Sequence, residues 1–245
     1  MDAFLNRSTG YTNANQRNPK ARWNERAAIL ERADLKPEHM VCDLQAASGY
    51  LADGIVSITG NAQNVVCVEP SASLAEKLAT RYETVVCELE KLPIQDNKFD
   101  RVLCLAGLHH SSSLSDTISE ACRILKPGGV VVLSDVEIGS SQDRWLNDIV
   151  HNNTTTGHDG KFLKLGQLSQ ELRSLNITVD HEDRVSVPWQ FASKQQMVEF
   201  MKELFTLSAM TSAQVEEALY DCFKIEESTM GVKLNWSLIY SKGIK

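Results

Sequence analysis

The stretch VCDLQAASGYLADGI, residues 41–55, decides how the rest of the chain is interpreted. It is an apolar run that ends in an acid, passes through small residues and continues with a helical pattern, as at a strand–helix junction of an open α/β sheet. Such sheets bind their cofactor at this junction, and glycines usually line it because the backbone approaches the ligand closely. Here Gln45, Ala46 and Ala47 stand where glycines are expected, and only Gly49 remains. The stretch is therefore a cofactor site, a damaged cofactor site or a plain connection between a strand and a helix.

The composition is that of an ordinary globular protein. The chain has 245 residues, 42% of them hydrophobic and 23% charged, which suits one main domain with a large core. The net charge of −7 makes nucleic acid a poor candidate for a partner. No apolar run approaches the roughly 20 residues of a membrane span. The first residues also lack the apolar core of a signal peptide, so we expect a cytoplasmic protein that does not contact a membrane.

The cysteines indicate core positions and no metal site. None of them forms a CxxC pair, and the first four lie in separate apolar runs, where cysteine behaves as a small hydrophobe. This usage is typical of a reducing compartment. The six positions are Cys42, Cys67, Cys87, Cys104, Cys122 and Cys222.

The first half of the chain alternates short β-rich runs with helical patterns. The runs are almost continuously apolar, as in a parallel sheet that is covered on both faces. The predicted strands are residues 40–44, 64–69, 84–88, 99–106 and 130–136, and the predicted helices are 50–59, 71–81 and 114–125. This alternation predicts a doubly wound α/β fold.

After residue 137 the pattern changes. We expect helices at 141–151, 164–175, 193–206 and 211–222, and strands at 176–188 and, as one long strand, 233–243. Residues 22–33 are predicted to form a helix, and the first 20 residues a loop or lid. The expected organisation is an N-terminal lid or helical segment, 1–35, and a single domain, 36–245, with helical insertions at about 141–175 and 189–225.

Four blocks in a fixed order carry a resemblance to a known family. They are VCDLQAASGY, VVCVEPS, CELEKLPIQDNKFDRVLCLAGLHH and RILKPGGVVVLSD. In this order they resemble the class I S-adenosylmethionine-dependent methyltransferases of the small-molecule type, over about residues 25–140. The resemblance implies a Rossmann-like sheet that is mostly parallel, with an antiparallel C-terminal strand and helices on both faces. It also implies S-adenosylmethionine as cofactor and S-adenosylhomocysteine as product.

The resemblance assigns cofactor contacts residue by residue. Glu69 is expected to accept hydrogen bonds from the ribose hydroxyls, and Glu88 from the adenine amino group, with the backbone of Leu89 against the ring; a surface acid is the alternative for both glutamates. S-Adenosylmethionine has no phosphate, so replacing glycines near it costs less than it would near a dinucleotide. The full expected set is Asp43, Gln45, Ala46, Ala47, Gly49, Glu69, Pro70, Glu88, Leu89 and Leu105.

Candidates for the chemistry follow the fourth and fifth strands. His109, His110 and Asp135 could accept a proton from the methyl acceptor, or they could position the loop. Substrate contacts are expected from residues that are polar or aromatic and lie outside the first half of the sheet, although a core or solvated role is the alternative for each. They are Tyr11, Glu137, His158, Trp189 and Phe191, with Arg22 and Trp23 closing the site from the N-terminal side.

Two functions from different classes follow. The first is an enzyme that methylates oxygen, nitrogen or carbon of a small molecule, as a monomer or homodimer. The second is a protein of the same fold that binds S-adenosylmethionine or another ligand without methyl transfer, which the glycine-poor junction favours. A nicotinamide-dependent oxidoreductase is disfavoured because GxGxxG is absent and LKPGG is present.

Overall fold

The chain divides into two units, each of which has its own sheet. The structure, a computed structural model, describes residues 2–245, with side chains from Thr9 onward. One unit, here called the large-sheet unit, contains residues 26–135, 163–185 and 238–245. The other, the small-sheet unit, contains the residues up to 25 together with 136–162 and 186–237. The division into a lid of residues 1–35 and a single domain stays a prediction.

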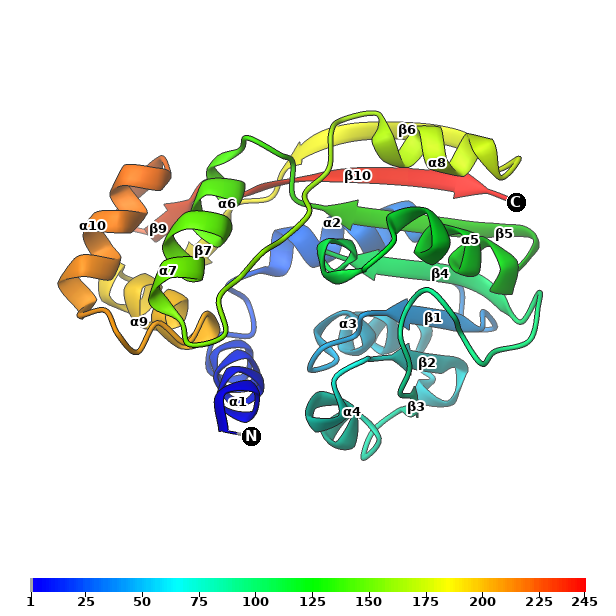
Figure 1. Ribbon diagram of the computed structural model, residues 1–245, viewed down its shortest axis with the longest axis horizontal. Coiled ribbons are helices and arrows are strands. Elements are labelled where there is room, and N and C mark those ends of the chain that lie inside the picture. The colour runs from blue at the N-terminus through cyan, green and yellow to red at the C-terminus, as the bar shows by residue number, and fades with distance from the viewer. Residues whose placement is uncertain (1) are drawn as a thin grey trace. The chain divides into compact units, whose positions relative to one another are not determined.

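The large-sheet unit is built on seven strands in the order β3-β2-β1-β4-β5-β10-β6 (Figure 1). Strands β1 to β5 are parallel to their neighbours, and β10 is antiparallel to β5. This confirms the predicted fold class. The strands are β1 (Val41–Leu44), β2 (Val65–Val68), β3 (Glu83–Val85), β4 (Phe99–Leu105), β5 (Leu125–Asp135), β6 (Thr178–Ser186) and β10 (Ser237–Ile244).

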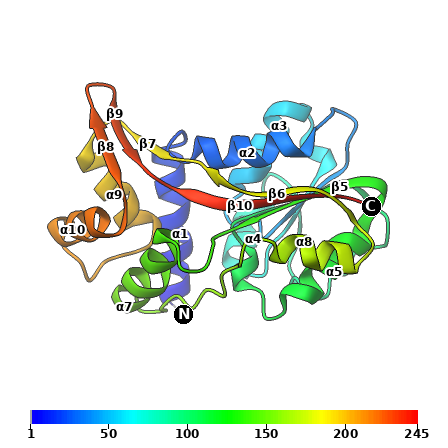
Figure 2. The same ribbon diagram turned by 90° about the horizontal axis from the view of Figure 1, so that it is seen from above.

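Helices cover both faces of this sheet, as apolar strands require. Figure 2 shows α2 and α3 on one face and α5 and α8 on the other. All residues of β1 and β2 are buried, because side chains on both faces of each strand meet a helix layer. The helices are α2 (Trp23–Ala33), α3 (Tyr50–Thr59), α4 (Ala72–Leu78), α5 (Leu114–Ile124) and α8 (Gln167–Ser174), with short 3₁₀ turns at Ala62–Asn64 and Leu108–His110.

Strand β5 begins earlier than predicted. The strand was predicted at residues 130–136, but it runs from Leu125 to Asp135 and includes the LKPGG segment. Leu125 pairs with Phe99 and Val130 with Arg101, so the residues between Leu125 and Val130 form a bulge. Gly128 has a φ of 78° there, and its N–H donates to the Lys245 carbonyl oxygen at 2.7 Å.

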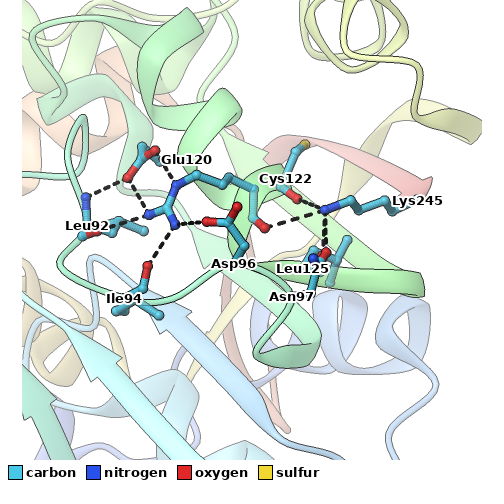
Figure 3. A network of polar contacts seen from close by, with 9 residues as sticks. Leu92, Ile94, Asp96, Asn97, Glu120, Cys122, Leu125 and Lys245 are labelled. Atoms are coloured by element: carbon cyan, nitrogen blue, oxygen red, sulfur yellow. Dashed lines mark hydrogen bonds and ion pairs between the residues drawn. The ribbon is translucent and has the colours of Figure 1, made fainter.

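A polar network holds the end of α5 against the start of β5 (Figure 3). Lys245 Nζ donates to the carbonyl oxygens of Cys122 at 2.9 Å and Leu125 at 2.7 Å, and to Asn97 Oδ1 at 2.9 Å. The last carbonyls of a helix have no partner within the helix, so the ammonium supplies one. Arg123 also donates to Glu120 Oε1 at 2.7 Å.

The small-sheet unit contains three antiparallel strands in the order β7-β9-β8 and several helices. Its strands are β7 (Trp189–Phe191), β8 (Ile225–Ser228) and β9 (Gly231–Leu234). Its helices are α1 (Asp2–Arg17), α9 (Lys194–Leu204), α10 (Ser212–Cys222) and a continuous helical stretch made of α6 (Ser141–Asp143), a π-helical segment (Arg144–Val150) and α7 (His151–Asn153).

Two predictions in this unit were wrong. The N-terminal 20 residues are not a loop, since α1 extends to Arg17. A Cβ on Gly10 would lie 2.5 Å from the Glu203 carbonyl oxygen, so glycine permits the close contact of α1 with α9. Residues 233–243 are not one strand either, because β9 ends at Leu234 and β10 begins at Ser237 in a different sheet. The backbone between them bends where Trp236 is buried and its carbonyl accepts from Val187 N–H at 2.8 Å.

Among the helices of the described residues, none combines the length and the apolar character that a membrane crossing requires.

Candidate functional site

The carboxyl ends of the parallel strands gather the predicted cofactor and catalytic residues on one edge of the large sheet. Strands β1, β2, β4 and β5 are mutually parallel, so their last residues lie at the same edge. Ligands of open α/β sheets bind outside this edge. Asp43 lies near the end of β1, Glu69 follows β2, Leu105 ends β4, and Asp135 ends β5.

The loop after β1 keeps a glycine-like backbone without the glycines. The φ angles are 59° at Gln45, 49° at Ala47 and 85° at Gly49, all in the left-handed region. Glycine enters this region freely, whereas a residue with a Cβ does so at a cost of about 1–2 kcal/mol. Gln45 and Ala47 therefore hold the loop shape that a glycine motif would give, and the loop stores strain at these two positions.

Glu69 ties this loop to the turn before α4. Its carboxylate is 1% exposed; Oε2 accepts from Ala47 N–H at 2.8 Å and Oε1 accepts from Ser71 N–H at 2.8 Å. Burial raises the pKa of Glu69 above its usual range, and the two backbone hydrogen bonds oppose that rise. Each carboxylate oxygen retains a second lone pair, so acceptance from ribose hydroxyls is chemically compatible with these bonds. Pro70 follows directly and leads into the turn.

Asp43 is a buried acid with one oxygen left for a ligand. The backbone N–H of Ala52 donates to its carboxylate, while Oδ2 has no hydrogen-bond partner within residues 2–245. Burial raises the pKa of Asp43 well above its usual range, and the charges of Glu69 and Asp53 act in the same direction. A buried acceptor without a partner is costly. The oxygen therefore fits a site whose ligand brings a donor, such as the ammonium of S-adenosylmethionine.

Gln45 lies directly against the loop after β4. A Cβ on Gly107 would be 2.6 Å from both Cβ and Cγ of Gln45, so glycine is required at position 107 for the two loops to meet. The neighbouring Ala106 has a φ of 52°, and its N–H donates to the Ser134 carbonyl at 2.8 Å. Leu105 pairs with Ser134 in the sheet. The side chain that replaces the first glycine thus fills space between β1 and β4.

The predicted adenine residues lie past the end of β3. The strand ends at Val85, three residues before Glu88, which is exposed, while Leu89 is 2% exposed. The next residue, Glu90, was not predicted. Its Oε1 accepts from Ser111 Oγ at 2.8 Å and from Ser112 N–H at 2.6 Å. Partial burial acts to raise the pKa of Glu90, but the hydrogen bonds from Ser111, Ser112 and Ser113 lower it to about 2.

His109 and Asp135 form a buried pair. Asp135 is 0% exposed and accepts from His109 twice, at Oδ2 from the backbone N–H at 2.8 Å and at Oδ1 from Nδ1 at 2.7 Å. If Nδ1 carries the proton, Nε2 is the acceptor nitrogen of the ring. The exposed His110 ring lies 4.1 Å from the His109 ring, centroid to centroid. The structure thus joins two of the three predicted catalytic residues in the arrangement of a general base and its orienting acid.

The five predicted substrate residues belong to the small-sheet unit. Trp189 and Phe191 are 2% and 5% exposed, and the Trp189 ring stacks on Trp236 with centroids 4.2 Å apart. Glu25 accepts from Trp189 Nε1 at 2.8 Å and pairs with Arg22, whose Nη1 donates to the Tyr11 hydroxyl at 2.6 Å. These residues form a polar and aromatic cluster in the core of the unit. Their role as substrate contacts stays a prediction.

His158 and Glu137 lie in the segment after β5. His158 is buried; its Nδ1 lies 3.1 Å from Asn147 Oδ1, and its backbone N–H donates to His151 Nδ1 at 3.2 Å. Asn147 Oδ1 also accepts from Gly160 N–H at 2.9 Å, so the polar segment 154–160 is held by Asn147 of the π-helical segment and by His151 of α7. Glu137 is half-buried, and its carbonyl accepts from Ser140 N–H at 3.2 Å.

One residue that contacts the loop could not be predicted from the sequence. Arg81 follows α4 and donates from Nη2 to the Ser48 carbonyl at 2.6 Å. It also donates from Nη1 to Asp53 Oδ1 at 2.5 Å. Arg81 is 33 positions from Ser48 along the chain, and no local pattern links the two.

Comparison with known proteins relates the chain to methyltransferases. Residues 43–133 match the model of a family described as "Methyltransferase domain". The ubiquinone/menaquinone biosynthesis C-methyltransferase UbiE of Ectopseudomonas mendocina (strain ymp) is 30% identical over 109 residues, which are 41% of this chain and 43% of that protein. The chain thus matches less than half the length of this curated relative.

Two solved structures show the same fold. One is described as a "SAM-dependent methyltransferase, possible histamine N-methyltransferase" from Thermotoga maritima; its TM-score is 0.64 at 18% identity, with 100% of this chain and 99% of that chain covered. The other is the "[4+2]-Cyclase SpnF", with a TM-score of 0.60 at 21% identity, covering 90% of this chain and 79% of that chain.

The strand order of the large sheet and the family match both indicate a methyltransferase. The cofactor of this family is S-adenosylmethionine, and the left-handed loop, Glu69 and the open oxygen of Asp43 fit it. Residues 43–133 match a methyltransferase domain, and the chain shares the fold of a solved S-adenosylmethionine-dependent methyltransferase, so it resembles the class I S-adenosylmethionine-dependent methyltransferases.

Proposed function

We propose that this protein transfers the methyl group of S-adenosylmethionine to a small molecule whose reacting atom carries a proton. The observation that carries the proposal is the left-handed backbone at positions 45, 47 and 49. Backbone strain of this kind is common at binding sites, and here two strained residues, Gln45 and Ala47, fall in one loop at the carboxyl ends of the parallel strands.

In this proposal the cofactor residues act as hydrogen-bond partners at the edge of the sheet. Glu69 accepts from the ribose hydroxyls through its remaining lone pairs, and Asp43 Oδ2 accepts from the cofactor's ammonium group or from a water that binds it. Glu88 and the backbone of Leu89 receive the adenine. The other predicted loop residues, Gln45, Ala46, Ala47 and Gly49, supply the surface against which the methionine part lies. S-Adenosylmethionine supplies the methyl group on its sulfonium.

His109 is proposed as the base. Its Nδ1–H donates to Asp135, which fixes the tautomer and the orientation of the ring and stabilises the imidazolium that forms. Nε2 then accepts the proton of the acceptor as the methyl group is transferred. Most of the remaining work is orientation, because displacement at a sulfonium needs an aligned nucleophile more than a change in its chemistry.

The proposed acceptor is a small molecule and not a nucleic acid. The name of the curated relative indicates methylation of carbon, and the Thermotoga structure is described as a "possible histamine N-methyltransferase". A carbon acid, a phenol or a protonated amine each has a proton that must leave, which is what the His109–Asp135 pair is suited to accept. Substrate contacts from Tyr11, Glu137, His158, Trp189 and Phe191 are part of the proposal.

The test begins with binding and ends with transfer. Isothermal titration with S-adenosylhomocysteine is expected to show one site per chain, and incubation with methyl-labelled S-adenosylmethionine and a panel of phenols, quinols and amines is expected to label one class of acceptor. Absence of binding would reject the cofactor site. When the binding of Glu69→Ala is measured, the matched control is Glu83→Ala, which removes an exposed acid from the same sheet without touching the loop.

A second function is binding without methyl transfer. The replacement of two motif glycines favours it, and the similarity to a [4+2]-cyclase shows that the fold is also found in a protein named for another reaction. Tight binding of S-adenosylhomocysteine together with no labelled product from any acceptor would favour this function over the first.

A further inference from the structure

Of the three motif positions, 45, 47 and 49, only Gly49 is still a glycine. The side chain of Arg81 lies against it. A Cβ on Gly49 would lie 2.7 Å from Arg81 Nη2 and 2.9 Å from Leu78 Cδ2. At Gln45 and Ala47 the chain tolerates a side chain in the same left-handed conformation. Gly49 is therefore needed for contact with Arg81 as well as for its own φ of 85°.

Arg81 links the loop to the first turn of α3. Its Nη2 donates to the Ser48 carbonyl at 2.6 Å, and its Nη1 donates to Asp53 Oδ1 at 2.5 Å. The Tyr82 hydroxyl donates to the same oxygen at 2.5 Å, and the Arg81 guanidinium lies 5.1 Å from the Tyr82 ring centroid. Besides Ser48, the guanidinium thus has two contacts that orient it, Asp53 and the Tyr82 ring.

The strained residue lies between two fixed groups. On its N-terminal side, the Ala47 N–H is held by Glu69. On its C-terminal side, the carbonyl of the next residue, Ser48, is held by Arg81. Glu69 thus holds the peptide before Ala47, and Arg81 holds the peptide between Ser48 and Gly49, so bonds to charged groups bracket the two-residue segment that contains Ala47 with its φ of 49°.

We propose that Arg81 is a positioning residue for the cofactor loop and that it takes over the role of the glycine missing at position 47. The loop needs a left-handed backbone to receive the cofactor; glycine would adopt it unaided, but Ala47 is held in it by Glu69 on one side and by Arg81, through Ser48, on the other. The proposal rests on the proposed cofactor site and adds a residue outside the family motif. It predicts that the importance of Arg81 depends on which residue stands at position 47.

A double-mutant cycle tests this dependence. Arg81→Ala is expected to weaken S-adenosylhomocysteine binding about 10-fold in the native background. In the background Ala47→Gly, the same change is expected to weaken binding less than about 2-fold, since glycine needs no external support. Arg81→Lys keeps the charge but loses the two-pronged contact, and it is expected to fall between. A role in stability alone would lower the melting temperature in both backgrounds without this rescue of affinity.

Lys98→Ala removes another ion pair of the large-sheet unit, with Glu83, and should leave affinity unchanged in both backgrounds. Equal losses from Arg81→Ala in the two backgrounds would overturn the proposal. If the unsubstituted protein fails to bind S-adenosylhomocysteine, the proposed function fails, but the inference is still tested by crystal structures of the Arg81→Ala variants. Ala47 should leave the left-handed region in the native background, and its persistence at positive φ would refute the role of Arg81.

Discussion

Glu69 combines two tasks in one carboxylate. It holds the Ala47 and Ser71 N–H groups and, in the proposed site, accepts from the ribose hydroxyls as well. Replacing it by alanine removes charge-assisted bonds of both kinds, so we expect Glu69→Ala to weaken cofactor binding by about 1.5–3 kcal/mol. Calorimetric titration with S-adenosylhomocysteine measures the change. Unchanged affinity would remove Glu69 from the site.

His109 can be separated into its two nitrogens by one substitution. In His109→Asn the amide nitrogen can still donate to Asp135 in place of Nδ1, while the position of Nε2 is empty. We expect kcat to fall by roughly 10²–10⁴ with little change in cofactor affinity, because the base acts on the acceptor. The measurement is turnover of the labelled acceptor, with His110→Asn as the control. Near-native kcat for His109→Asn would mean that positioning alone drives the reaction.

Asp43 is expected to make stability depend on pH. A carboxyl has a pKa of about 3.9 in an unfolded chain. In the folded protein the pKa of Asp43 is raised by burial, so the folded state binds the proton more tightly and loses stability as pH rises above about 4. Asp43→Asn lacks this loss. Its melting temperature minus that of the unsubstituted protein should therefore be larger at pH 8 than at pH 4. A difference that does not vary with pH would contradict the buried charge.

At the scale of the element, Lys245 joins the last strand to the end of α5. Its ammonium donates to backbone carbonyls of Cys122 and Leu125, as Figure 3 shows. In Lys245→Met these acceptors lose their charged donor, so we expect the free energy of unfolding to fall by about 1–2 kcal/mol while cofactor affinity stays unchanged. Urea denaturation followed by circular dichroism measures this, with the exposed Lys224→Met as control. A drop in cofactor affinity would show that the network reaches the site.

Elements with a strong local signal could be predicted, and those decided by distant contacts could not. The apolar runs predicted the ends of β1, β2 and β4 to within two residues. A strand that is buried on both faces needs apolar side chains at almost every position, so its sequence pattern is clear. Helix α1 was missed because its asparagines, threonines and Gly10 are weak helix formers, and it depends on packing against α9. The break at Trp236 was missed because an apolar strand pattern does not show which sheet each half joins.

At the scale of the whole molecule, the sequence predicts which residues face the cofactor edge but not how they are held. Asp43, Glu69 and Asp135 follow from strand ends, since parallel strands end together. The contacts of Arg81 with Ser48 and of Glu90 with Ser111 each join segments more than twenty residues apart, and charged residues of this kind are normally on the surface. The chain's two units also mix segments from its beginning, middle and end, which local patterns do not reveal.

The left-handed Ala47 has a consequence for the order in which this site can change. If Arg81 supports the backbone at Ala47, the residue at each of these two positions limits which substitutions the other can accept. A chain that acquires glycine at position 47 first can then lose Arg81 freely, whereas a chain that loses Arg81 first passes through a form with a weakened site. The same rule applies in reverse: alanine is accessible at position 47 only once the arginine is in place. Directed evolution from this sequence should therefore reach Arg81 substitutions only in lineages that already carry the glycine.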